Sequence, residues 1–124
     1  MQPIQLFELA SSKAHWLSVR QNVVTGNIAN ANTPGYVTME IDPFETVLQS
    51  VGTSMSATHP MHFTEDSMRG AVRADGGDVA VSPSGNSVAL EEELMKAGEV
   101  RQEYELNAGI LRSFHRMMLM TVRK

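Results

Sequence analysis

The sequence has no cysteine, no excess of basic residues and no long apolar run, and each absence excludes a class of protein. Without cysteine the chain can form no disulfide, bind no metal through thiolates and offer no thiol nucleophile. Lysine and arginine total 10 against 14 aspartate and glutamate, which gives a net charge of −4 at pH 7. Because no basic stripe is available to neutralise phosphates, we expect no nucleic-acid partner.

No stretch approaches the ~20 consecutive apolar residues that a membrane-spanning helix needs. The first ten residues lack a basic segment, and Glu8, Lys13 and His15 interrupt any apolar run, so we expect no cleavable signal peptide. A chain of 124 residues predicts a single domain or less, with a modest core.

The most informative stretch is a decapeptide that ends the first amphipathic segment: Asn27, Ile28, Ala29, Asn30, Ala31, Asn32, Thr33, Pro34, Gly35 and Tyr36. Pro34 sets φ at the first corner of a type II turn, and Gly35 can take the positive φ that the second corner needs. Thr33 precedes proline and is therefore disfavoured in a helix, so the helix must end at or before Asn32. A well-made helix end would explain Pro-Gly alone, but the whole decapeptide is more particular.

Both ends of the chain predict long amphipathic helices, over about residues 4–31 and 88–122. Apolar residues recur in each at seven-residue intervals, the spacing of a coiled coil. We expect a mainly α fold in which the two helices pack as an antiparallel, coiled-coil-like hairpin, the second helix starting at Asn86 or Ser87. The predicted packing seam consists of Leu9, Trp16, Val23, Leu90, Leu94, Ala97, Tyr104, Leu111, Phe114 and Met118.

The chain thus divides into an N-terminal axial helix with its Pro-Gly turn (1–35), an irregular linker (36–85) and a C-terminal axial helix (86–124). Glycine and proline punctuate the linker. Within it, residues 40–50 predict a short helix with Phe44, Val47 and Leu48 on one side. Residues 71–73 and 78–81 predict a small β-hairpin.

Charge along the C-terminal helix is uneven, with glutamates crowded in its first half and arginines in its second. This polarity complements the helix dipole, so a solvated, well-capped helix explains it. The alternative is that acidic and basic ends of neighbouring molecules meet in an axial stack.

Residues suited to catalysis or metal binding are sparse. His59 and His62 have a spacing that can ligate zinc, but no carboxylate is evidently fixed beside them, and a metal site needs three or four ligands. Glu99 and Glu103 lie one helical turn apart, with no third group spaced to orient them. We therefore expect no catalytic residue, no cofactor and no metal; a small metal-dependent enzyme using the two histidines is the rival hypothesis.

The decapeptide resembles the N-terminal motif of the bacterial flagellar axial proteins, which reads Asn-hydrophobic-Ala-Asn-x-small/polar-Thr-Pro-Gly-aromatic. The chain departs from that pattern at Val37, where the family usually carries lysine or arginine. The short length and the stretches 57–62 and 85–91 resemble the proximal rod proteins of the basal body, nearest the membrane ring. Ala89 stands where those proteins usually carry aspartate.

The resemblance implies a non-enzymatic, structural subunit of the flagellar basal-body rod that polymerises through its terminal helices into the torque-transmitting tube. It implies export through the flagellar type III apparatus without signal cleavage, and assembly in the periplasmic rod. The implied partners are copies of itself, other rod proteins and the membrane-ring adaptor protein at the rod base. The alternative is a helical adaptor or export chaperone that does not polymerise.

Overall fold

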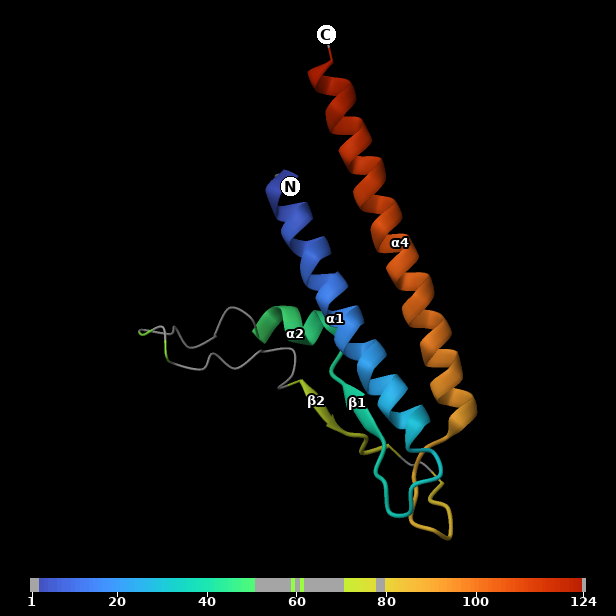
Figure 1. The fold of residues 1–124 in the computed structure, drawn as a ribbon. Helices are drawn as coiled ribbons and strands as arrows, with labels where there is room; N and C mark the ends of the chain where they lie inside the picture. Colours follow the sequence, from blue (N-terminus) through green and yellow to red (C-terminus); the bar gives the residue numbers. More distant parts are fainter. Residues whose placement is uncertain (1–2, 51–58, 60, 62–70, 78–79, 124) are drawn as a thin grey trace.

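The computed structural model describes residues 3–50, 59, 61, 71–77 and 80–123. Two long helices dominate it, α1 (Pro3–Ala29) and α4 (Leu90–Val122), and they lie side by side in antiparallel directions (Figure 1). Between them in sequence come β1 (Met39–Ile41), α2 (Phe44–Ser50) and β2 (Val72–Ala74). The predicted mainly α fold, with long terminal helices and a small β element in the middle, is confirmed.

Helix α1 ends at Ala29, within the limit that Pro34 imposes. Asn30 follows it, and both its backbone N–H (3.1 Å) and its side-chain amide (2.8 Å) donate to the carbonyl of Gly26. The turn comes next: Gly35 has φ +71°, and the N–H of Tyr36 donates to the carbonyl of Thr33 at 3.3 Å. The predicted positive φ at Gly35 is therefore confirmed.

The apolar core lies around the middle of α1, which passes between α4 on one side and α2 with the strands on the other (Figure 1). Trp16 anchors it, because its ring lies 6.0 Å from that of Phe44 and its Nε1–H donates to the carbonyl of Asp42 at 3.0 Å. Burying each large apolar side chain contributes about 1.5–3 kcal/mol. The buried cluster comprises Trp16, Leu17, Ile41, Phe44, Val47, Ala71 and Val100.

Helix α2 is shorter than the helix predicted over 40–50. It begins at Phe44, because residues 39–41 form a strand and because Pro43 disfavours a helix that includes the residues before it. Phe44 and Val47 face the core as expected, whereas Leu48 is 42% exposed.

The sheet corrects the predicted hairpin. Strand β2 pairs antiparallel with β1, with Glu40 opposite Arg73, and not with residues 78–81. Hydrogen bonds from Asp42 N–H to Ala71 (3.0 Å) and from Asp75 N–H to Thr38 (2.8 Å) extend the ladder at both ends. Residues 78 and 79 lie outside the described residues, and 80–81 form no strand. The pairing with β1 is favoured because it places Ile41 and Ala71 together in the core.

Helix α4 begins at Leu90, later than the Asn86 or Ser87 start that the sequence predicts. Those two polar side chains are used elsewhere, as described below. Three glutamates occupy its first turn, which suits the positive end of the helix dipole. Helix α4 extends past the N-terminal end of α1 (Figure 1). In the part of the chain that the structure describes, no helix has the length and apolarity to cross a membrane.

Candidate assembly site

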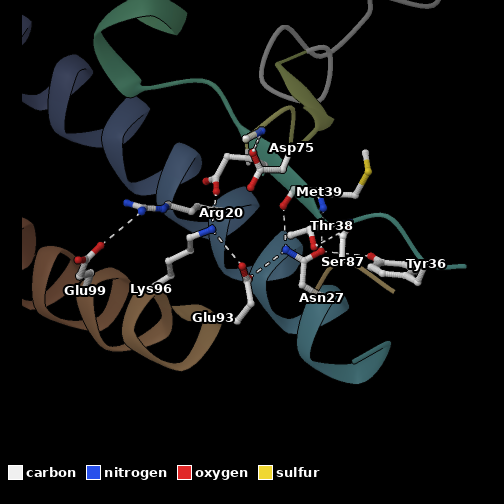
Figure 2. A network of polar contacts seen from close by, with 12 residues as sticks. Arg20, Asn27, Tyr36, Thr38, Met39, Asp75, Ser87, Glu93, Lys96 and Glu99 are labelled. Carbon is white, nitrogen blue, oxygen red and sulfur yellow. Dashed lines mark hydrogen bonds and ion pairs between the residues drawn. The ribbon is translucent and has the colours of Figure 1, made fainter. Parts of the chain in front are cut away.

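The first residue of the decapeptide, Asn27, is fully buried (0% exposed) where α1, the segment before β1 and α4 meet (Figure 2). Its Nδ2 donates to the carbonyl of Met39 (2.8 Å) and to the carboxylate of Glu93 (3.0 Å). Its Oδ1 accepts from the N–H of Met39 (3.0 Å) and from the hydroxyl of Tyr36 (3.2 Å). A side-chain amide has two donor and two acceptor positions, so all of them are used here.

The buried carboxylate of Glu93, only 1% exposed, continues this network onto a lysine. Lys96 donates to Glu93 at 3.0 Å and to Glu40 of β1 at 2.7 Å. Burial alone would lower the pKa of the Lys96 ammonium, but the hydrogen bonds and negative charges of Glu40 and Glu93 raise it above the ordinary lysine value. The buried negative charge is thus paired, and the first turn of α4 is tied to both α1 and β1.

A second buried asparagine, Asn86, holds the end of α1. Its Nδ2 donates to the carbonyls of Asn30 (2.8 Å) and Thr33 (2.7 Å), and its Oδ1 accepts from the N–H of Val88 (2.8 Å). These two carbonyls lie just beyond the last residue of α1 and also accept from the N–H groups of Thr33 (3.0 Å) and Tyr36 (3.3 Å), so Asn86 adds a second donor to each of them. Ser87 acts nearby, since its Oγ accepts from the N–H of Thr38 at 2.9 Å. These bonds explain why neither side chain caps α4.

Two glycine turns meet beside this asparagine. Gly35 and Gly85 both have positive φ, +71° and +80°, a region that favours glycine. The N–H of Gly35 donates to the carbonyl of Ser84 at 3.0 Å. A Cβ atom on Gly85 would lie 3.4 Å from the Cα of Gly35, so the two turns are in close contact. The Pro-Gly turn is therefore held against the segment that leads into α4.

The ten residues of the decapeptide differ in exposure, so the motif has a buried part and an exposed part. Asn27 is buried, and four residues are half-buried: Ile28, Asn30, Ala31 and Tyr36. The remaining residues are exposed, namely Ala29, Asn32, Thr33, Pro34 and Gly35. The motif thus fixes its ends within the chain and leaves the tip of its turn accessible.

The predicted seam positions of α1 lie toward α2 and the strands. Trp16 is buried against Phe44, and Leu9 is half-buried beside the same core cluster. Val23 lines an open groove together with Met39 and Val72. The residues of α1 that touch α4 belong to the neighbouring face.

On α4, the row that meets α1 alternates polar and apolar residues at seven-residue intervals: Glu93, Val100, Asn107 and Phe114. Asn107 donates to the carbonyl of Ala10 at 3.0 Å, and the ring of Phe114 lies 5.6 Å from that of Phe7. Among the predicted seam residues, Phe114, Ala97 and Leu111 are half-buried, whereas four are exposed: Leu90, Leu94, Tyr104 and Met118.

Ion pairs complete the contact between the two long helices. Lys13 pairs with Glu103 at 2.8 Å, and Arg20 pairs with Glu99 at 3.4 Å. The two carboxylates that lie one turn apart therefore each face a basic residue of α1. Ion pairs at the surface contribute at most about 1 kcal/mol each, and the main effect of these partly buried pairs is on register.

The histidine pair considered for zinc cannot be assembled from the described residues, because His62 lies outside them. The Nδ1 of His59 accepts a hydrogen bond from the N–H of Met61 at 3.2 Å. Over residues 3–50, 59, 61, 71–77 and 80–123, no three His, Asp or Glu side chains are grouped as metal ligands would be.

Sequence reasoning placed Asn27 and Tyr36 in a motif but did not assign them a contact, and it missed Glu93 and Asn86 as partners. A signal for Glu93 exists: it stands seven residues before Val100, on the row that faces α1. Its two neighbouring glutamates carry the same charge, so periodicity is the only feature of the sequence that separates them.

The fold is a helical hairpin, in which two long antiparallel helices are joined by a buried polar junction. A family of flagella basal body rod proteins matches residues 14–36, a range that contains the whole decapeptide. The flagellar basal body rod protein FlgB of Agrobacterium fabrum is 51% identical over 130 residues, covering 100% of this chain and 97% of that protein. The chain therefore belongs to the flagellar basal body rod proteins.

Proposed function

We propose that the chain is a non-enzymatic subunit that polymerises through its terminal helices into the torque-transmitting tube of the flagellar rod. The observation that carries this proposal is the apolar surface left uncovered along α4. Soluble monomers rarely expose large contiguous apolar patches, and such patches mark interaction surfaces. The exposed large apolar residues of α4 are Leu90, Leu94, Met95, Tyr104, Leu106, Ile110, Met117, Met118, Leu119, Met120 and Val122.

The junction around Asn27 supports the same role in a second way. A tube that carries torque needs subunits of one shape, so the angle between α1 and α4 must not vary from copy to copy. A fully satisfied buried polar network favours one register, because any shift leaves buried donors and acceptors without partners. Side chains interdigitated along the length of such helices then spread the load over many contacts.

The subunit would be exported through the flagellar type III apparatus without signal cleavage and assembled in the periplasmic rod. Its partners there would be copies of itself, other rod proteins and the membrane-ring adaptor protein at the rod base. Membership of the rod protein family supports this placement.

Purified hook–basal bodies from the source bacterium provide the test. Quantitative mass spectrometry should find the chain in a fixed ratio to the membrane-ring protein. Electron tomography of cells lacking its gene should find membrane rings without a rod. A non-polymerising adaptor or export chaperone would instead remain in the soluble cell fraction, and its absence from the purified particles would refute the proposal.

A further inference from the structure

Two basic residues of α1, Lys13 and Arg20, stand one helical turn before and one helical turn after Trp16. The Nζ of Lys13 lies 4.5 Å from the centroid of the Trp16 ring and 5.0 Å from that of the Phe44 ring. The guanidinium carbon of Arg20 lies 5.3 Å from the Trp16 centroid. These distances are within the roughly 6 Å over which a cation is attracted to an aromatic face. The single tryptophan of the chain therefore has a cation beside it from each neighbouring turn.

The same two cations also contact α4. Lys13 pairs with Glu103 at 2.8 Å, and Arg20 pairs with Glu99 at 3.4 Å (Figure 2) and with Glu103 at 3.8 Å. Each cation thus contacts an aromatic ring of the core and a carboxylate of α4 at once. Lys13 by itself connects α4 to α2, because Phe44 is the first residue of α2.

Burial makes these cations depend on the carboxylates. The side chains of Lys13 and Arg20 are only 26% and 16% exposed, so both charges have lost much of their contact with water. The Nε of Arg20 is buried, and the described residues give it no hydrogen-bond partner. A cation in such surroundings is stable only while an opposite charge is close. Without the carboxylates of α4, the two long side chains would turn their charged ends to water and leave the rings.

We propose that Lys13 and Arg20 couple the docking of α4 on α1 to the docking of α2 on α1. When α4 is in place, its carboxylates hold the cations beside the rings of Trp16 and Phe44, and α2 is held firmly. Helix α1 lies between α4 and α2, so the coupling passes through side chains of α1 (Figure 1). The two cations are positioning residues, and firm docking of α2 reports that the helical hairpin is closed. This coupling belongs to the single chain and goes beyond the proposed function.

Hydrogen exchange measured by mass spectrometry on the purified full-length chain follows the two docking contacts separately, through the amides of α4 and those of α2. The variant E99Q/E103Q keeps the shape of both side chains and removes their charge. We expect the amides of α2 to exchange at least about 5-fold faster, although the substituted residues lie on the other side of α1 (Figure 1). The control E91Q/E92Q removes the same charge from exposed residues of α4 and should leave α2 unchanged. Unchanged exchange of α2 in E99Q/E103Q would overturn the proposal.

A further variant distinguishes this coupling from a general loosening of the hairpin. Asn107 donates to the carbonyl of Ala10 at 3.0 Å, a contact between α4 and α1 that involves neither cation. Asn107→Ala should speed exchange in α4 and change exchange in α2 by less than about 2-fold. If Asn107→Ala and E99Q/E103Q loosened α2 in the same proportion to α4, any weakening of the hairpin would suffice, and the two cations would have no special role.

The last comparison repeats the charge removal without the cations. K13M/R20M keeps long apolar side chains on α1 and removes both charges. In this background E99Q/E103Q should no longer change the exchange of α2, because the connection is already absent. Circular dichroism checks that the helices remain; if they do not, K13M with and without E103Q provides the same comparison for one ion pair. An undiminished effect of the glutamine substitutions on α2 would show that the coupling takes another route and would refute the proposal.

Discussion

At one end of the helical hairpin, the side-chain amides of Asn27 and Asn86 donate hydrogen bonds to distant parts of the chain; at the other, α4 extends with methionines and leucines exposed to solvent. The polar junction is buried, and its hydrogen bonds are made within the chain. The far end of α4 is exposed, and apolar side chains are also exposed at the start of α4, at Leu94 and Met95. The same pair of helices therefore carries one contact that forms on folding and, under the proposed function, a second surface that a partner covers.

This difference suggests that separate parts of α4 contribute to folding stability and to the proposed assembly. Buried polar networks contribute modest net stability but penalise any arrangement that leaves a member unpaired. Exposed apolar surface contributes nothing until it is covered, and then roughly 25 cal/mol for each Å² removed from water. The junction therefore fixes the geometry of the subunit. Under the proposed function, the apolar surface exposed along α4 stabilises the assembly once a partner covers it.

Replacing Asn27 by aspartate should have the largest effect. The shape is retained, but the two donors to Met39 and Glu93 are lost and a second carboxylate is placed beside a buried one. We expect the free energy of unfolding to fall by about 3–5 kcal/mol, measured by urea unfolding followed by circular dichroism. The control is Asn22→Asp on the exposed face of α1, which should change it by less than about 0.5 kcal/mol. Equal effects of the two variants would show that the junction does not specify the fold.

Gly35→Val should have an intermediate effect. The space around Gly35 is open, so the cost arises from its positive φ alone and should be about 2 kcal/mol or more for a β-branched residue. Gly35→Asn should cost clearly less, because asparagine tolerates the left-handed region. The same unfolding measurement ranks the two variants. A valine as well tolerated as asparagine would mean that the turn does not need this conformation.

Met120→Ala, near the C-terminal end of α4, should have the smallest effect on folding, within about 0.5 kcal/mol, because the side chain is 63% exposed. Val100→Ala is the matched change on the buried face of the same helix and should cost about 2 kcal/mol. Rod incorporation of the Met120 variant, measured by mass spectrometry of hook–basal bodies, should nevertheless fall. A marked loss of folding stability from Met120→Ala would mean that this side chain is already covered within the chain.

Local signals in the sequence predicted the parts of the fold that local chemistry determines. Heptad periodicity predicted both long helices, and Pro34 with Gly35 predicted where the first would end and which residue would turn left-handed. The pairing of β1 with β2 escaped prediction, because residues 39–41 and 72–74 are far apart in sequence and each is only three residues long. Nothing local states which strand is the partner.

The contact between the helices was harder to predict for a different reason. The most regular apolar row of α4, which includes Leu90 and Tyr104, predicts a packing seam on that face. The row that meets α1 instead contains Glu93 and Asn107, whose partners are a buried amide and a backbone carbonyl. A hydrophobic pattern shows that a helix face requires cover, but it does not say whether the cover comes from the same chain.

The bond between Asn27 and Glu93 also sets an order of events during synthesis and folding. It joins residues 66 positions apart, so one of the two side-chain N–H donors of Asn27 lacks this partner until α4 is available. A chain that emerges from its N-terminus cannot complete these buried polar contacts early, because Glu93 comes about three quarters of the way along it. The junction between α1 and α4 therefore forms only after most of the chain is free.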